Sequence, residues 1–433
     1  MLKSFTLKNG IKVATYSIPE MRSVFVSLMV KAGSIFETKK NSGVAHLMEH
    51  MLVQGIPSLP NVEVFSDYIE GLAGGYNAAT AMQSIRFIIN APARHLEDVL
   101  RISSEVMFEP LFEDNAIERE RRAVLEEIKE RQDSLWYKNN QFFTVTRYKK
   151  GHPMLLDGGG LLESVSILTR QDLINYWESF FYPSNTHLVI VGGFDNNKVE
   201  KLVEQFFTKV KNSQIFPGFP NYTNNDLSNK KVAIRHDPKL QICYLDLCFP
   251  SISDNASLKE RTQQTIIRNI LGGLRRSRLY RLLRQRKGLV YSVNFSLAVY
   301  QNFGYADISC QVSKENLEEV VDLIAKELIA FIKNGPLEEE IIFAKNHHIN
   351  QCLMSWDHPS AVADWIGGDL LWEKKIYLPE EYVKIIEEVD VQSIIEFMKK
   401  NWDFQKLNLM IQGPVENTKA NIQKFESLIS DIK

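Results

Sequence analysis

His46-Leu47-Met48-Glu49-His50 places two imidazoles four positions apart, with a carboxylate directly before the second. Residues four apart on an α-helix lie one turn above each other, so both rings can bind one metal ion at ~2.0–2.1 Å. Glu49, three positions after His46, lies beside them and can take a proton from a water on that ion. The stretch therefore predicts a helix that carries a zinc hydrolase site, with Glu49 as the general base.

The residues around this stretch are largely apolar. Gly43-Val44-Ala45 precedes it and Met51-Leu52-Val53 follows it, so the helix should be partly buried. Buried ionisable groups need partners, and a divalent cation supplies one. The alternative, a chance spacing on a solvated helix face, fits these flanks less well. A zinc ion with two protein ligands requires a third from elsewhere in the chain.

The best source of a third ligand is the helical stretch from Glu118 to Ile128. Glu120 and Glu127 are seven positions apart, so two turns return them to nearly the same side of the helix. One of them can bind the metal while the other orients a histidine. Glu126 points about 100° away from Glu127. The alternative is an ordinary surface helix, because arginines interleaved with these glutamates can pair with them.

Together the two stretches resemble the inverted H-x-x-E-H zinc peptidases of the pitrilysin, or insulinase, family, and most closely its half-length bacterial members similar to mitochondrial processing peptidases. The resemblance implies one Zn²⁺ per chain, bound by His46, His50 and Glu127. It makes Glu120 the outer acid that orients a ligand, and Glu49 the catalytic base. The implied activity is that of a metalloendopeptidase on short or unfolded peptides.

A stretch from Gly75 to Thr80 resembles the family's strand beside the metal, where an extended substrate adds its backbone to the sheet edge. The resemblance implies that Asn77 and Ala78 contact substrate. A plain turn around Gly74 and Gly75 is the alternative.

The segment from Ser277 to Ser292 resembles the family element that carries an arginine and a tyrosine seven positions apart. The resemblance implies that Arg284 holds a substrate carbonyl and that Tyr291 donates to the oxyanion of the tetrahedral intermediate. Gln285 stands where the family commonly has a glutamate.

Without the resemblance, the same basic segment could bind nucleic acid or an anionic membrane, and Gly272-Gly273 could form a phosphate loop. The strand-G-x-x-x-x-G-K-[ST] context of a phosphate loop is missing from the sequence. The whole chain has 51 basic and 53 acidic residues, a net charge of −2, and so no global field for a polyanion. We therefore expect neither a nucleic acid nor a membrane as partner.

The composition limits the setting of the protein. With 433 residues and 44% hydrophobic content, the chain should form at least two domains. The N-terminal residues contain no apolar signal sequence, and no apolar run approaches the ~20 residues of a transmembrane helix. Four cysteines form no C-x-x-C pair and are expected as reduced core residues: Cys243, Cys248, Cys310 and Cys352. The expected location is the cytoplasm.

An internal duplication is visible as similar blocks about 220 residues apart. His95 to Leu100 recurs at Asn316 to Val321, and Val189 to Gly193 recurs at Leu409 to Gly413. Residues with strand patterning alternate with helical stretches in both halves. The predicted class is therefore α+β, with two homologous domains, each a mostly antiparallel sheet backed by helices.

The expected domain bounds are a zinc-binding peptidase domain at residues 1–212, a linker at 213–230, and a peptidase-like domain at 231–433 that supplies the arginine and tyrosine. The linker is rich in Asn, Pro and Ser. In the second copy, the positions equivalent to the two histidines fall near Ile267 and Leu271, so only the first copy should bind zinc.

Three other features lie outside these motifs. His347-His348 lies near the position equivalent to Glu127, but adjacent helical residues diverge by about 100°, so an ordinary packed helix is the better interpretation. His152 and the run from Gly158 to Gly160 resemble a family loop, which we interpret as a flexible substrate-side loop.

The family builds its chamber from four such domains, whereas this chain has two. By analogy, Arg284 and Tyr291 of one subunit would face the zinc of its partner, which predicts a homodimer with composite active sites. A heterodimer with a paralogue is the alternative assembly. A different alternative is a non-catalytic scaffold or partner subunit of a larger processing-peptidase-like assembly, although such relatives usually have degraded metal motifs.

Overall fold

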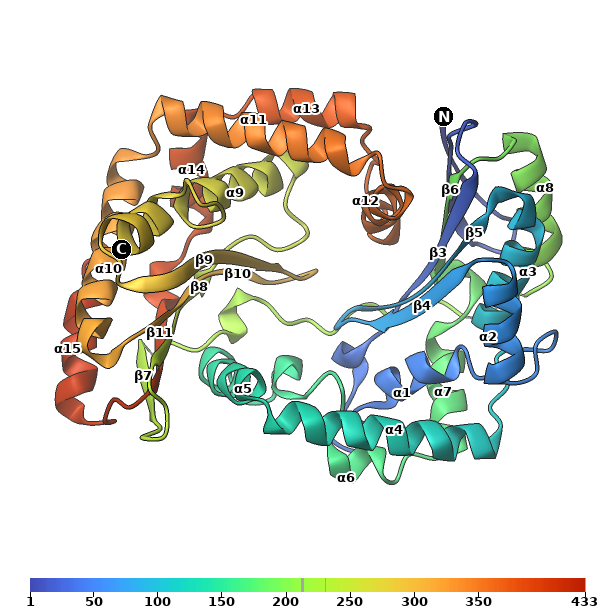
Figure 1. Ribbon diagram of the computed structural model, residues 1–433, viewed down its shortest axis with the longest axis horizontal. Helices are drawn as coiled ribbons and strands as arrows, with labels where there is room; N and C mark the ends of the chain where they lie inside the picture. The colour runs from blue at the N-terminus through green and yellow to red at the C-terminus, as the bar shows by residue number, and fades with distance from the viewer. Residues whose placement is uncertain (212–213, 230, 433) are drawn as a thin grey trace. The chain divides into compact units, whose positions relative to one another are not determined.

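Each half of the protein forms around one mixed β-sheet in the computed structural model, which describes residues 1–211, 214–229 and 231–432 (Figure 1). The chain divides into two compact units. The first comprises Met1–Asp133, Leu156–Pro220 and Leu353–Tyr377. The second comprises Ser134–Leu155, Asn221–Cys352 and Leu378–Lys433.

The first unit contains a six-stranded sheet in the order β1-β2-β6-β3-β5-β4. All neighbouring strands are antiparallel except β2 and β6. The central strands β3 and β6 are buried almost throughout, because helices cover both faces of the sheet there. The strands are β1 Leu2–Thr6, β2 Lys12–Ser17, β3 Ser23–Lys31, β4 Gly75–Thr80, β5 Ser84–Pro92 and β6 Thr186–Gly192.

Helices on one face of this sheet enclose the main apolar core of the first unit, whereas α12 covers the opposite face. On that opposite face, α12 packs against β3 and β6. The helices of the first unit are α1 Val44–Met51, α2 Val62–Gly71, α3 Leu96–Phe108, α4 Asp114–Asp133, α6 Leu162–Val165, α7 Arg170–Phe180, α8 Asn196–Phe207 and α12 Pro359–Leu371.

The second unit contains a five-stranded sheet in the order β7-β11-β8-β10-β9, which matches β2-β6-β3-β5-β4 of the first unit strand for strand. Only β7 and β11 are parallel. Three equivalent pairs of strands begin 220 residues apart, at Lys12 and Val232, Ser23 and Cys243, and Ser84 and Gly304. This confirms the predicted α+β class and its duplication. The strands are β7 Val232–His236, β8 Cys243–Pro250, β9 Val290–Val299, β10 Gly304–Val312 and β11 Asn408–Gly413.

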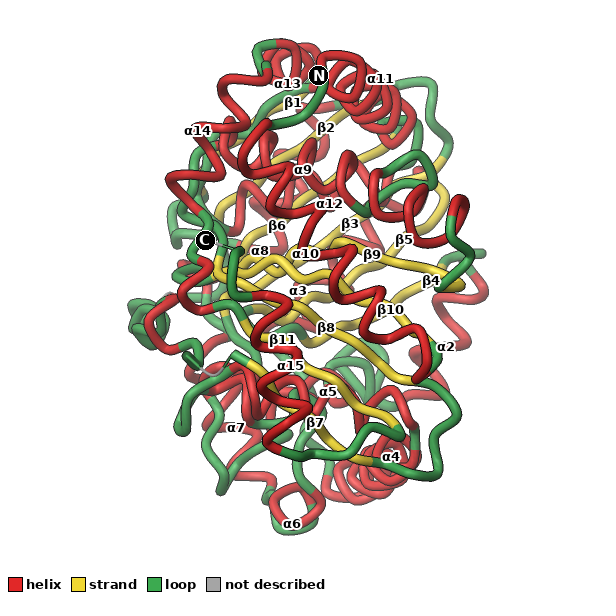
Figure 2. Tube along the Cα trace, turned by 90° about the vertical axis from the view of Figure 1, so that its left-hand side faces the viewer, coloured by secondary structure: helices red, strands yellow, loops and turns green. Residues whose placement is uncertain are grey.

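Figure 2 shows α10 and α15 in front of the strands of the second sheet. Contacts of α15 with β7, and of α9 with β9, join this helical layer to the sheet. The helices of the second unit are α5 Leu135–Arg147, α9 Leu258–Leu271, α10 Leu317–Asn334, α11 Glu338–Ser355, α13 Pro379–Glu387, α14 Val391–Asn401 and α15 Lys419–Ile429, of which α11 runs to the unit's boundary.

Two helices belong to the unit opposite to the one that their sequence position suggests. α5 packs against β8 and β11, and Arg147 at its end forms a buried ion pair of 2.9 Å with Asp246 of β8. α12 buries Val362 and Ile366 in the first unit. The compact units therefore differ from the expected linear bounds, because one face of each sheet is covered by a helix from the other half of the chain.

The linker expected at residues 213–230 is largely irregular where it is described, with one short 3₁₀ turn at Asn224–Asp226. Its ends, Ser213 and Lys230, lie outside the described residues. Within the described ranges, no helix combines the length and the apolar character needed to cross a membrane.

Candidate metal centre

The rotation of α1 determines which side chains it presents to the metal centre. Its apolar side is buried in the core of the first unit through Val44, Ala45, Leu47, Met48 and Met51. On its other side, His46, Glu49 and His50 are half-buried. The ring centroids of the two histidines are 4.9 Å apart, with their planes at 86°. Burial of the apolar side thus directs both imidazoles and the carboxylate to the same region.

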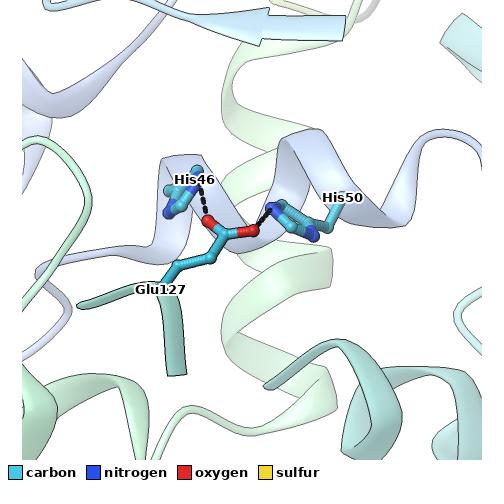
Figure 3. Close-up of side chains that lie close together, drawn as sticks. All are labelled: His46, His50 and Glu127. Atoms are coloured by element: carbon cyan, nitrogen blue, oxygen red, sulfur yellow. Dashed lines mark ion pairs between the residues drawn. The ribbon is translucent and has the colours of Figure 1, made fainter. Parts of the chain in front are cut away.

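Glu127 of α4 lies between the two imidazoles (Figure 3). Its Oε2 is 3.5 Å from His46 Nε2, and its Oε1 is 3.9 Å from His50 Nε2. Two ligand atoms bound tetrahedrally to one zinc ion lie about 3.4 Å from each other. Ligand atoms from the three side chains all lie within 4.8 Å of one another. Two imidazoles and one carboxylate at this spacing fit a zinc ion that keeps one open position.

The second nitrogen of each imidazole has an oxygen acceptor. His50 Nδ1 lies 3.1 Å from Glu120 Oε2, and His46 Nδ1 lies 3.3 Å from the carbonyl oxygen of Gly159. If Nδ1 carries the proton in each ring, Nε2 is left with a lone pair directed at the centre. The structure thus places Glu127 between the two Nε2 atoms and Glu120 beside Nδ1 of His50.

Burial and neighbouring charges together shift the pKa values of the two histidines in opposite directions. Burial lowers the pKa of His46, and the neighbouring His50 lowers it further. Burial acts the same way on His50, but the hydrogen bond to Glu120 and the charge of Glu127 outweigh it and raise the pKa of His50. The same hydrogen bond lowers the pKa of Glu120. The outer carboxylate therefore stays ionised beside the histidine that it orients.

The run from Gly158 to Gly160, which the sequence suggested as a flexible substrate-side loop, packs against the start of α1. A Cβ on Gly160, whose φ is +97°, would lie 2.6 Å from the Cα of Gly43. The Gly159 amide donates to Asp157 at 2.9 Å, and Asp157 pairs with Arg131 of α4 at 3.1 Å. The loop therefore supports His46 through its backbone, a role that the glycine run alone did not reveal.

Glu37 is a further residue that sequence reasoning missed. Its two carboxylate oxygens accept hydrogen bonds from the backbone amides of Gly43 and Ala45, each at 2.9 Å. These amides are among the unpaired donors at the start of a helix. Glu37 is only 6% exposed, and this burial raises its pKa to about 7. The side chain thus fixes the first turn of α1, directly before His46.

Glu49 is half-buried, and among the described residues it forms no ion pair. Its carboxylate therefore remains available as a base. The nearby strand β4 pairs with β5 along one edge only, in the described part of the sheet. Thr80 at its end donates to the Ala45 carbonyl of α1 at 3.2 Å. Asn77 is exposed on this strand and Ala78 is half-buried, so an extended segment could pair with the free edge beside the metal ligands.

Arg284 and Tyr291 lie together in the second unit. Arg284 is exposed on η6, a π-helix at Tyr280–Arg286, and its guanidinium carbon is 5.3 Å from the centre of the Tyr291 ring. Tyr291 is 82% exposed at the start of β9. π-helical turns are rare in proteins, and those that occur are often found at functional sites. The structure brings these two side chains together, whereas the metal ligands belong to the first unit.

Two further histidines that the sequence singled out, and the cysteines, lie in packed surroundings. His348 Nε2 lies 2.9 Å from the Tyr382 hydroxyl, consistent with an ordinary packed helix. His152 is buried and stacks on Tyr148 at 4.3 Å, and its burial lowers its pKa to about 4. All four cysteines are buried, and none of them forms a disulfide in the described part of the chain. Among the described residues, the candidate metal-binding group is that of the first unit.

Comparison with known proteins identifies two matching family models. One, described as insulinase or peptidase family M16, matches residues 12–149. The other, described as the peptidase M16 inactive domain, matches residues 168–347. The first match contains the candidate metal ligands, and the second contains Arg284 and Tyr291.

Similar proteins cover nearly the whole chain. A protein of Rickettsia felis named as an uncharacterized zinc protease is 26% identical, over 91% of this chain and 93% of its own. The beta subunit of the mitochondrial-processing peptidase of Neurospora crassa is 25% identical, over 95% and 87%. In fold, the chain is similar to a protease from Helicobacter pylori, with a TM-score of 0.84 at 19% identity over 96% and 99% of the two chains. A structure titled as a peptidase M16 inactive domain, from Pseudomonas fluorescens, gives 0.86 at 19% identity over 97% and 99%.

Removal of the carboxylate ligand should abolish metal binding. We expect the purified protein to hold close to one zinc per chain, and Glu127→Gln to hold almost none, because a neutral amide is a poor zinc ligand. Glu120→Gln should weaken zinc affinity about 10–100-fold by releasing His50. Elemental analysis and chelator competition measure both effects. The matched control is Glu126→Gln, an exposed neighbour paired with Lys129, and equal zinc loss in this control would contradict the assignment.

The buried carboxyl of Glu37 predicts a pH dependence of stability. Its pKa is about 7 in the fold against an ordinary 4.5, so the folded protein binds this proton more tightly than the unfolded chain does. The stabilisation from this proton is fully present below pH 4.5 and is lost as the pH rises through about 7. Over this range, the free energy of unfolding of the parent protein should fall by about 3 kcal/mol relative to that of Glu37→Gln. Denaturant unfolding of the metal-free proteins at low and neutral pH tests this, with exposed Glu20→Gln as control. A stability difference that is independent of pH would refute it.

Proposed function

Because the chain belongs to the insulinase family, peptidase family M16, we propose that it is a zinc-dependent endopeptidase that cleaves short or unfolded peptides. The observation that carries this proposal is the convergence of His46, His50 and Glu127, with their ligand atoms within 4.8 Å of one another. Glu49 lies on the same face of α1 with no partner that would occupy its carboxylate, among the residues described.

The proposed mechanism assigns the proton transfers to Glu49. A bound zinc ion would supply Lewis acidity for the peptide carbonyl and for the attacking water. Glu49 takes a proton from that water as it attacks, and gives the proton to the leaving amine. Glu120 and the Gly159 carbonyl hold the two imidazoles in a fixed orientation during both steps.

Substrate selection in this proposal depends on main-chain pairing. The free edge of β4 offers backbone donors and acceptors to an extended peptide, and Asn77 is exposed on that edge. An unfolded segment can adopt an extended strand, whereas a folded domain has few free backbone groups to offer. We therefore propose peptides and unfolded segments as substrates, with Asn77 and Ala78 as contacts.

Arg284 and Tyr291 complete the proposed site from a second subunit. The Tyr291 hydroxyl would donate to the oxyanion, and the Arg284 guanidinium would hold a substrate carbonyl. Both side chains are exposed and adjacent, which suits a role on a bound substrate. Since this chain carries both the proposed metal ligands and this pair, a C2 homodimer suffices. The mitochondrial relative is named as a beta subunit, and a heterodimer with a paralogue is therefore the alternative assembly.

A second candidate function is that of a non-catalytic scaffold or partner subunit. It is favoured by the inactive-domain match over residues 168–347. It is also favoured by Ile267 and Leu271, which lie near the positions equivalent to the two histidines and are fully buried. These observations concern the second unit, while the first retains its ligands and base. Protein that lacks zinc and does not cleave a quenched peptide library would favour the scaffold.

The cytoplasm is the proposed location. Four buried cysteines that form no disulfide among the described residues are compatible with a reducing compartment. Detection of the protein in the periplasmic or secreted fraction of its cell would contradict this location.

Replacing the proposed base should separate catalysis from metal binding. We expect Glu49→Gln to keep its zinc and to lose peptide cleavage by about 10²–10⁴-fold, because the amide cannot take the proton. Cleavage of a quenched peptide and zinc content, measured on the same sample, test this. Glu126→Gln serves as the control with unchanged activity. Cleavage by Glu49→Gln at the unaltered rate, sensitive to a chelator, would remove Glu49 from the mechanism.

Mixed dimers distinguish composite sites from sites within one chain. Glu49→Gln and Tyr291→Phe subunits should each be nearly inactive alone. After unfolding and refolding together, the mixed dimers should regain one intact site each, because one subunit supplies Glu49 and the other supplies Tyr291. Activity restored by mixing supports the composite homodimer, and activity that stays at the sum of the two inactive proteins argues against it.

A further inference from the structure

One of the two proposed zinc-binding imidazoles is oriented by the protein backbone. His46 Nδ1 lies 3.3 Å from the carbonyl oxygen of Gly159, whereas His50 Nδ1 lies 3.1 Å from a carboxylate oxygen of Glu120. A substitution can remove the Glu120 carboxylate, but no substitution removes a main-chain carbonyl. The orientation of His46 therefore depends on the groups that hold the backbone of Gly159 in place.

The Gly159 carbonyl belongs to a tight turn from Asp157 to Gly160. The Gly160 amide donates to the Asp157 carbonyl oxygen at 2.9 Å, which is the hydrogen bond that closes a β-turn. This amide and the Gly159 carbonyl are parts of the same planar peptide group and point in opposite directions. The bond that fixes the amide therefore also fixes the direction of the carbonyl, which faces His46.

The side chain of Asp157 links this turn to α4. Its Oδ1 accepts from the Gly159 amide at 2.9 Å and lies 3.1 Å from Nη2 of Arg131. The Asp157 side chain is 12% exposed and that of Arg131 is 30% exposed, so this ion pair is better shielded from solvent than a surface pair. Arg131 lies one helical turn after Glu127, the proposed carboxylate ligand, so α4 carries both side chains on one side.

The guanidinium of Arg131 also packs directly on Gly159. A Cβ at this position would overlap the end of the Arg131 side chain, so the guanidinium occupies the space that a larger residue would need. The φ of Gly159 lies outside the left-handed region, unlike that of Gly160. An alanine can therefore adopt the backbone conformation of Gly159, and its methyl group would displace Arg131 rather than the turn.

We infer that Arg131 is a positioning residue for His46, acting through Asp157 and the turn at Gly159. With the turn in place, the Gly159 carbonyl accepts the Nδ1 proton, and Nε2 keeps the lone pair that a metal ion requires. Without Arg131, Asp157 loses a charged partner and the carbonyl is less firmly directed. The imidazole then also populates the tautomer with the proton on Nε2, which cannot bind the metal. This role rests on the proposed zinc site and does not depend on peptide cleavage.

Two variants of the full-length protein test this role from opposite sides of the contact. Arg131→Gln removes the charge, whereas Gly159→Ala keeps the charge but displaces it. We expect each variant to weaken zinc affinity about tenfold, the lower end of the loss that follows when the partner of a ligating histidine is disturbed. Competition with a chelator measures zinc affinity, and thermal unfolding confirms that each variant is folded.

Each variant has a matched control. Lys129→Gln removes a cation from the same helix, where Lys129 pairs with Glu126 at 2.7 Å. Gly158→Ala adds the same methyl group one position earlier, where its nearest contact would be an ordinary one of 3.6 Å with the Ser34 hydroxyl oxygen. Both controls should bind zinc as the parent protein does.

The tautomer of His46 distinguishes positioning from a general loss of structure. In metal-free protein labelled with ¹⁵N-histidine, under mildly alkaline conditions, the parent should carry the His46 proton on Nδ1. Arg131→Gln and Gly159→Ala should shift part of the population to Nε2, while the signals of His348 in the second unit stay unchanged. Comparison with His46→Gln identifies the signals of His46.

The outcomes separate this role from the proposed function. Unchanged zinc affinity and an unchanged tautomer in both folded variants would overturn the inference, and so would an equal loss of zinc in the controls. If both variants show the expected shifts but the parent protein cleaves no peptide, the role of Arg131 stands and the peptidase assignment fails. If the parent protein binds no zinc, the proposed metal site fails, and the tautomer alone decides the role of Arg131.

Discussion

The candidate metal centre depends on the packing of one short helix. α1 has eight residues, too few for a stable helix in isolation, so its rotation and position are set by what it contacts. One side of α1 is buried in the apolar core, and Glu37 accepts hydrogen bonds from the backbone amides at its start. On its other side, α1 packs against α4. Glu127 and Glu120 then meet the imidazoles at 3.1–3.9 Å because α4 returns both carboxylates to the same side after two turns. Displacement of α1 by one residue would direct a different set of side chains to α4.

The duplicated fold divides the chemistry between two similar units. The same strand order occurs in both sheets, yet the second unit has the buried Ile267 and Leu271 of α9 near the positions equivalent to the two histidines. The second unit instead carries exposed cationic side chains on η6 and beside it. The two units also exchange the helices α5 and α12, so neither half of the chain contains the complete cover of its own sheet. This exchange gives a physical reason for the two copies to remain in one chain.

Much of the fold and of the site could be predicted from the sequence, because the signals were periodic. The i, i+4 spacing of the histidines and the seven-residue spacing of the glutamates predict which side chains share a helix face. The repeat of about 220 residues predicts that the topology occurs twice. Glu37 and the Gly159 carbonyl could not be predicted, since a helix cap from a loop and a backbone acceptor leave no residue pattern. The packing of α5 on the second sheet and of α12 on the first was also not predicted, because local sequence does not indicate which of two similar sheets a helix covers.

The central claim is that three side chains from two helices hold one zinc ion. The most direct test is a crystal structure with anomalous scattering recorded on both sides of the zinc absorption edge. The account predicts a single strong zinc peak within about 2.0–2.2 Å of His46 Nε2, His50 Nε2 and a Glu127 carboxylate oxygen. A zinc-loaded crystal with no peak between these atoms, or with Glu127 turned away from both imidazoles, would contradict it.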